Sequence, residues 1–222
     1  MTKITELGFC MGVIVETVVS TYNAKRQANA APIGVMMKRP NCIALRIFNS
    51  SLTYNNIKLK RCAVINLISD AEIFYHTAFK ETNQNARIPQ EWFEKAETVD
   101  APQLQKAEAL IEVTVVEIQP FDSERTEVTC KVQRIKASSI LPKAYCRAQA
   151  ATIEAIIHAT RVKVFVTKSS RQNQERTLRL LEKIKECNNI VNCVAPNSCY
   201  SEIMADLNQR IESWRTIGES LR

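Results

Sequence analysis

The stretch ANAAPIGVMMKRPNCIALRIFNSSLTYNNI, residues 28–57, contains the features around which the rest of the chain is organised. It opens with small residues and a proline at residues 29–34, where a core strand would need bulkier side chains. Such a backbone is open to close approach by a flat molecule. An apolar, strand-like run at residues 42–48 then ends in hydroxyl and amide side chains at residues 49–53, where we expect a short helix to begin.

The junction between this strand and the helix is a candidate anion site. The first turn of a helix presents unpaired backbone N–H groups and the positive end of its dipole, which favour phosphate. Ser51 is a candidate N-cap, but Tyr54 stands where a capping box would have Glu or Gln. Arg46 and Lys58 add positive charge nearby. On local pattern alone, a simple helix cap formed by Ser50 and Ser51 is the favoured reading over an anion site.

Composition places the chain among ordinary globular proteins. It has 222 residues, 45% hydrophobic and 24% charged, enough for one large or two modest domains. No apolar run reaches the length of a membrane span, and the N-terminus lacks the pattern of a signal peptide, so we expect a cytoplasmic protein. The net charge of +7 is scattered along the chain, which favours a solvated basic surface over a nucleic-acid partner.

The eight cysteines do not form a recognisable framework. They contain no CxxC pair, and the three near the C-terminus are spaced too widely for a usual zinc knuckle, so we predict no metal site. Cys42, Cys62 and Cys130 fall in strand-like runs, where a thiol behaves as a small buried hydrophobe.

Alternation and turn residues predict a mainly β N-terminal domain with a few helices. The expected strands are residues 12–21, 29–37, 42–48, 62–68, 107–119 and 126–135, with a helix at 52–60 and a helical turn at 71–75. Short turns between strands indicate an antiparallel, Greek-key-like barrel. Residues 80–106 are polar and irregular and are interpreted as a covering insertion.

The composition changes near Lys136, and we place domains at residues 1–136 and 137–222. An alanine-rich helix is expected at 141–161, a short strand or extended connection at 162–166 and a linker at 169–174. A charged helix and a last helix opened by Asn197 and Ser198 complete a helical subdomain. The apolar stripes of these helices fit packing within the chain or a dimer interface. His158 is interpreted as a core or boundary residue, and the role of Arg147 is left open.

Several runs together resemble a known family. The runs LGFCMGVIVETVVSTYN, ANAAPIGV, LRIFNSSLTYNNI and CAVINLISDAEIFYHTAF, with CRAQAATIEAIIHATRV further on, are similar to the archaeal DUF447 family. Its members are flavoproteins of the FMN-binding split-barrel superfamily. The resemblance implies a split β-barrel followed by a C-terminal helical subdomain, a homodimer, and FMN held at or near the subunit interface.

Carried over position by position, the resemblance implies two groups of FMN-binding residues. Beside the flavin ring it places Asn29, Ala31, Pro32, Ile33 and Gly34, and around the phosphate Arg46, Asn49, Ser50, Ser51 and Thr53. Asn56 and Asn66 are further candidates. For Asn66 two readings stand equal: an amide that closes hydrogen bonds within the protein, or one that faces the ligand.

The leading hypothesis is an FMN-dependent oxidoreductase of the flavin-reductase type, in which the cofactor supplies the redox chemistry. The catalytic residues are unknown, because no acid, base or nucleophile constellation stands out. No GxGxxG fingerprint is present, so a reduced nicotinamide or deazaflavin would be a transient donor. The alternatives are a non-catalytic FMN carrier, a protein-interaction module, or a pyridoxamine-phosphate-oxidase-like enzyme.

Overall fold

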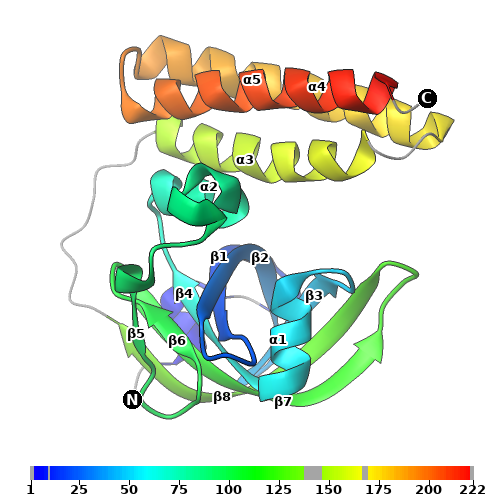
Figure 1. The fold of residues 1–222 in the computed structure, drawn as a ribbon. Helices are drawn as coiled ribbons and strands as arrows, with labels where there is room; N and C mark the ends of the chain where they lie inside the picture. The colour runs from blue at the N-terminus through cyan, green and yellow to red at the C-terminus, as the bar shows by residue number, and fades with distance from the viewer. Residues whose placement is uncertain (1–2, 10, 138–146, 167–169, 221–222) are drawn as a thin grey trace. The chain divides into compact units, whose positions relative to one another are not determined.

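The computed structural model describes residues 3–9, 11–137, 147–166 and 170–220. Contacts divide the chain into two compact units (Figure 1). One unit comprises Met1–Ser69 and Phe79–Leu141, and the other comprises Asp70–Ala78 and Pro142–Arg222. The second unit therefore takes in a short segment from the N-terminal half of the sequence.

The first unit is a closed barrel of six antiparallel strands in the order β1-β2-β3-β8-β7-β4 (Figure 1). The strands are β1 (Ile14–Tyr22), β2 (Ala28–Arg39), β3 (Cys42–Phe48), β4 (Cys62–Leu67), β7 (Ala109–Pro120) and β8 (Arg125–Ala137). A short 3₁₀ helix, η1 (Ile4–Leu7), precedes them. Each strand matches an expected one to within a few residues.

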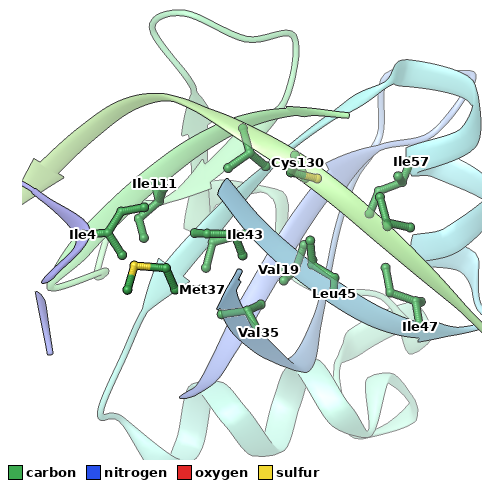
Figure 2. Close-up of a cluster of buried hydrophobic side chains, with 14 of the residues drawn as sticks. Ile4, Val19, Val35, Met37, Ile43, Leu45, Ile47, Ile57, Ile111 and Cys130 are labelled. Carbon is green, nitrogen blue, oxygen red and sulfur yellow. The ribbon is translucent and has the colours of Figure 1, made fainter. Parts of the chain in front are cut away.

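The barrel interior is an aliphatic core. Figure 2 shows side chains from several strands meeting there, among them Val19, Val35, Ile43 and Leu45, which are fully buried. Cys130 and Cys42 are buried too, as expected for thiols in strands. The six described cysteines are all free.

Strand β4 is buried on both faces, which explains why its sequence is apolar throughout. Ala63 and Ile65 point into the barrel core, whereas Cys62 and Val64 belong to a second buried cluster outside it. That second cluster is completed by Ala96, Val99, Ala101 and Leu110. A strand covered on both sides has no wet face, so it reads as a continuous apolar run.

The covering residues belong to the insertion predicted at residues 80–106. It contains the 3₁₀ turns η2 (Lys80–Thr82), η3 (Gln84–Ala86) and η4 (Gln90–Trp92), and a small hairpin of β5 (Phe93–Lys95) and β6 (Pro102–Leu104). The insertion is therefore more ordered than its polar sequence indicated.

Helix α1 (Leu52–Lys60) has the predicted bounds. The Ser51 hydroxyl accepts a hydrogen bond from the Tyr54 amide at 3.1 Å, so Ser51 is the N-cap. Arg61 ends the helix in the left-handed conformation, with φ 57°.

The second unit is helical. It contains α2 (Ala71–Ala78), α3 (Arg147–Phe165), α4 (Arg171–Val194) and α5 (Cys199–Ser220). Their shared core includes Ile156, Val162, Ile184, Met204 and Leu207. In the described part of the chain, no helix has both the length and the apolar character needed to span a bilayer.

Two expectations for this unit were wrong. Residues 162–165 continue α3, because Val162 extends the buried stripe of Ala148, Ala155 and Ala159 at helical spacing. Residues 171–174 are not a linker but the exposed first turn of α4, which the Ser170 hydroxyl caps. The expected start of α3 at residue 141 lies outside the described residues.

Candidate functional site

A pocket of about 840 Å³ opens on the barrel unit. Its size falls within the range of about 300–1,000 Å³ that small-molecule sites occupy. Three segments line it: the turn into β2, the start of α1 and the first half of the insertion. The lining residues are Asn23, Gln27, Ala28, Asn29, Leu52, Lys80 and Gln84 through Glu91.

A chain of polar contacts joins these three segments. The buried Asn29 amide donates to the Thr53 hydroxyl at 3.2 Å, and Thr53 is itself only 2% exposed. The Lys80 ammonium donates to the side-chain oxygen of the same asparagine. Burial lowers the pKa of Lys80, and the neighbouring Glu81 opposes that shift. Two predicted site residues, Asn29 and Thr53, are thus brought into direct contact.

The outer wall of the pocket is tied to β2 by one side chain. The Gln90 amide accepts a hydrogen bond from the Ala28 N–H at 3.0 Å and donates to the Ala28 carbonyl at 3.2 Å. Ile88 beside it is buried. Asn85 and Ala86 adopt left-handed backbone conformations with φ of 58° and 51°, which side-chain-bearing residues seldom do. The wall therefore has a defined shape.

Strand β2 has an edge that strand pairing leaves open. Residues 28–36 pair with β1, but the ladder to β3 begins only at Val35. Ala31, Pro32, Ile33 and Gly34 are half-buried along that edge. A ligand lying against them would meet backbone groups that β3 does not use, as the sequence interpretation required.

Gly34 also has a local reason to be glycine. A Cβ at this position would lie 2.8 Å from the Ile14 Cγ2 atom and 3.3 Å from the Glu16 Oε1 atom. The side chains of β1 therefore exclude a larger residue here even without a ligand.

Arg46 is engaged elsewhere. Its Nε donates to Glu127 at 3.1 Å, and its guanidinium carbon lies 4.0 Å from the centre of the Phe121 ring. Lys38 bonds the same carboxylate at 2.6 Å. The pKa of Glu127 is lowered, first by the Lys38 hydrogen bond and then by Arg46, against the effect of burial. Arg46 is not among the residues that line the pocket.

The remaining residues predicted to bind the phosphate lie in different surroundings. Asn49 faces the β7–β8 hairpin, where its side-chain oxygen accepts from the Thr126 hydroxyl at 2.5 Å. Ser50 is exposed and Ser51 serves as the cap. Asn56 is buried and donates to Thr21 at 3.0 Å.

Asn66 is fully buried and satisfied by the protein. Its amide nitrogen donates to the carbonyl of Val18 at 2.7 Å and to the hydroxyl of Ser20 at 2.9 Å. Its oxygen accepts from the Leu104 N–H at 2.8 Å. These bonds favour the first of the two readings, in which Asn66 ties the β5–β6 hairpin to the barrel.

Comparison with known proteins identifies the family. Residues 15–140 match the model described as "Protein of unknown function (DUF447) N-terminal domain". That span is more than half of the 222 residues. The chain belongs to the DUF447 family. No curated protein matches its sequence.

Comparison with a solved structure of the same family establishes the fold. An FMN-bound DUF447 protein from Methanosarcina mazei is 20% identical, with 93% of this chain and 98% of that chain covered at a TM-score of 0.73. A putative flavin reductase with a split-barrel domain from Shewanella frigidimarina is 14% identical over 58% of this chain and 69% of that chain, with a TM-score of 0.48. The predicted split barrel followed by C-terminal helices is confirmed.

Sequence reasoning missed Lys80 and Gln90. Both lie in the insertion, which was interpreted only as a cover. The one available signal was the position of the insertion directly after β4 and α2, because long irregular segments often serve a site. Nothing in the local sequence indicated which of its polar residues turn inward.

Proposed function

We propose that this DUF447 protein binds FMN along β2 and in the adjoining pocket, as a flavoprotein related to flavin reductases. The observation that carries the proposal is the position of the pocket. It is walled by the start of β2 and the start of α1, which are the two segments that the sequence analysis selected. The fold likeness to an FMN-bound protein of the same family supports the choice of ligand.

The residues present fit such a cofactor. The open edge of β2 at Ala31, Ile33 and Gly34 offers backbone groups at which a flavin ring can form hydrogen bonds. The pocket and the first turn of α1 offer polar groups for the ribityl and phosphate part, with Thr53 and Asn29 held in place by their mutual bond. When bound, FMN would supply the electron-transfer chemistry, while the chain binds and orients it.

The test is a titration of the purified protein with FMN. We expect saturable quenching of FMN fluorescence, and a sample purified with its cofactor should release FMN on denaturation. Thr53→Ala should weaken binding by about 1–3 kcal/mol, because a buried hydrogen-bonding hydroxyl is lost. A wild-type protein that shows no saturable quenching would refute the proposal.

We infer an oxidoreductase of the flavin-reductase type, and a protein that only carries FMN is the alternative. Of the pocket-lining residues that the structure describes, Glu91 alone is acidic and none is His or Cys, which suits hydride transfer that needs no protein acid or base. Anaerobic mixing of the FMN-loaded protein with NADH, NADPH or reduced deazaflavin should bleach the flavin with one of them. Bleaching with none would favour the carrier.

We further propose a homodimer formed through the outer face of the barrel. Met11, Val13 and Ile14 are more than half exposed at the start of β1. Ile14 pairs across the strands with the half-buried Met36, which adjoins these residues. Adjoining exposed apolar side chains mark protein interfaces. Ile14→Glu should convert the dimer to a monomer in light scattering, and a wild-type monomer at micromolar concentration would contradict the proposal.

A further inference from the structure

Lys80 is a half-buried cation at the pocket wall, and no salt bridge pairs it with an acid among the residues that the structure describes. Its ammonium donates to the Asn29 side-chain oxygen, and this neutral amide is its one polar side-chain partner among the residues described. An ammonium has three donors, so two remain for a ligand. Burying a charge without a partner is costly, and buried charges in proteins are normally paired.

Other buried charges of the barrel follow that rule. Glu127 lies between Lys38 and Arg46. Glu112, 1% exposed, accepts from the N–H groups of Thr98 and Val99 and lies 3.6 Å from an Arg134 nitrogen. Lys80 departs from this pattern, and it lines the pocket.

We propose that Lys80 binds the 5′-phosphate of the flavin nucleotide and makes the site selective for FMN over riboflavin. The inference rests on the proposed function and assigns the orientation of the ligand within it. The phosphate lies in the pocket between Lys80 and the first turn of α1, and the ring lies along the open edge of β2.

The surroundings of Lys80 suit a phosphate dianion. Asn29 fixes the ammonium from one side and is itself held by Thr53, so the donor is placed before the ligand arrives. Leu52, in the first turn of α1, lines the same pocket, where the helix dipole favours negative charge. Arg87 lines it as well and adds an exposed positive charge.

The experiment compares FMN with riboflavin, which lacks only the phosphate. Wild-type protein should bind FMN about 10- to 100-fold more tightly, as expected for a charge-assisted hydrogen bond. Lys80→Met keeps the length of the side chain but removes the charge, and should abolish that preference while the affinity for riboflavin changes less than about twofold. Lys80→Arg should retain part of it. Lys106→Met, which removes an exposed lysine that does not line the pocket, is the matched control for net charge and should retain all of it.

A second measurement does not depend on how the variants fold. Inorganic phosphate should compete with FMN on the wild-type protein but leave riboflavin binding unchanged. If phosphate competes with neither, the inference is wrong.

The remaining outcomes separate this inference from the proposed function. A wild-type protein that binds both flavins equally would overturn the role of Lys80 and leave flavin binding standing, whereas binding of neither would overturn both. Equal weakening of both flavins by Lys80→Met would make Lys80 a structural residue. Loss of the FMN preference in Arg46→Ala, with Lys80→Met retaining it, would place the phosphate at Arg46.

Discussion

The two halves of the insertion between α2 and β7 differ in how they surround a charged side chain. The second half, with the β5–β6 hairpin, closes over Glu112, and its backbone N–H groups satisfy the carboxylate. In the first half the Lys80 ammonium lines a pocket, and among the described residues its side-chain hydrogen-bond partner is the neutral Asn29 amide. The insertion thus contributes hydrogen bonds that satisfy the Glu112 carboxylate, and it also contains Lys80, whose ammonium retains donors for a ligand.

On the proposal that Lys80 binds the phosphate of FMN, this difference distinguishes residues that stabilise the barrel from residues that bind the ligand. A closed polar contact contributes to the free energy of unfolding, and its removal leaves buried groups without partners. A polar group whose partner is the ligand contributes little to the free energy of unfolding of the free protein, because its hydrogen bond forms only in the complex. Substitutions in the second half should therefore change stability, and those in the first half should change affinity.

The largest effect on stability is expected from Glu112→Ala. The backbone N–H groups of Thr98 and Val99 would lose a buried acceptor, which should cost about 2–4 kcal/mol of unfolding free energy. Glu112→Gln keeps an acceptor oxygen and should lose less. Urea unfolding measures the loss, and FMN titration of the folded variant should give the wild-type affinity. A weakened affinity at unchanged stability would break the distinction between the two halves.

Asn66→Leu should have the next largest effect, about 1–3 kcal/mol. The substitution removes the acceptor of the Leu104 N–H and the donor to the Val18 carbonyl, and so detaches the hairpin from the barrel. The measurement is again urea unfolding with FMN titration alongside. If stability is retained and FMN binding is lost, Asn66 faces the ligand, which is the other reading that the sequence allowed.

Gln90→Ala probes the first half and should have a smaller effect on stability, about 0.5–1.5 kcal/mol. Its two bonds to the Ala28 backbone position the pocket wall, so FMN affinity should fall several-fold. Gln84→Ala is the matched control, because Gln84 lines the same wall but its side chain has no hydrogen-bond partner in the described part of the chain. Equal effects of the two variants would show that the clamp does not matter.

The sequence was sufficient to predict the strands of the barrel, because each strand has a recognisable local pattern. Apolar runs and turn residues gave the strands, and Ser51 with the polar run before it gave the bounds of α1. Asn29 and Thr53 were selected as site residues from the family resemblance, and the structure brings them together. For the strands and α1 the local pattern was sufficient, because the residues that define each element lie close together in sequence.

Long-range pairing was beyond the sequence. Arg46 seemed available for phosphate because Glu127 is 81 residues away, on the strand that pairs with β3. Lys80 and Asn29 are 51 residues apart, and nothing in a polar loop indicates which lysine turns inward. In the tail, Val162 to Phe165 read as extended because β-branched and aromatic residues favour strands, but helix packing overrode that propensity.

The smallest expected effect on stability comes from Glu127. It tests whether the ion pair between Glu127 and Arg46 stabilises the fold. Because its pKa is lowered in the folded protein, Glu127 contributes stability above the pKa of the unfolded chain. That contribution is lost as the pH falls through the lower, folded value. Glu127→Gln should therefore show a shallower loss of unfolding free energy on acidification than the wild type, in urea unfolding followed from neutral pH downward. The difference should be small, because the side chains of Lys38 and Arg46 are 35% and 37% exposed and water screens them.

The same acid titration, repeated with FMN bound, tests whether Arg46 stays paired with Glu127 or binds the phosphate. If Arg46 stays with Glu127, bound FMN raises stability by a similar amount across the range where Glu127 titrates. If the phosphate instead draws Arg46 away, Glu127 loses a partner, its pKa rises towards the ordinary value, and the acid loss of stability begins at higher pH in the complex than in the free protein. A shift of that kind would show that Arg46, like Lys80 in the proposal, binds the phosphate instead of only pairing with an acid of the barrel.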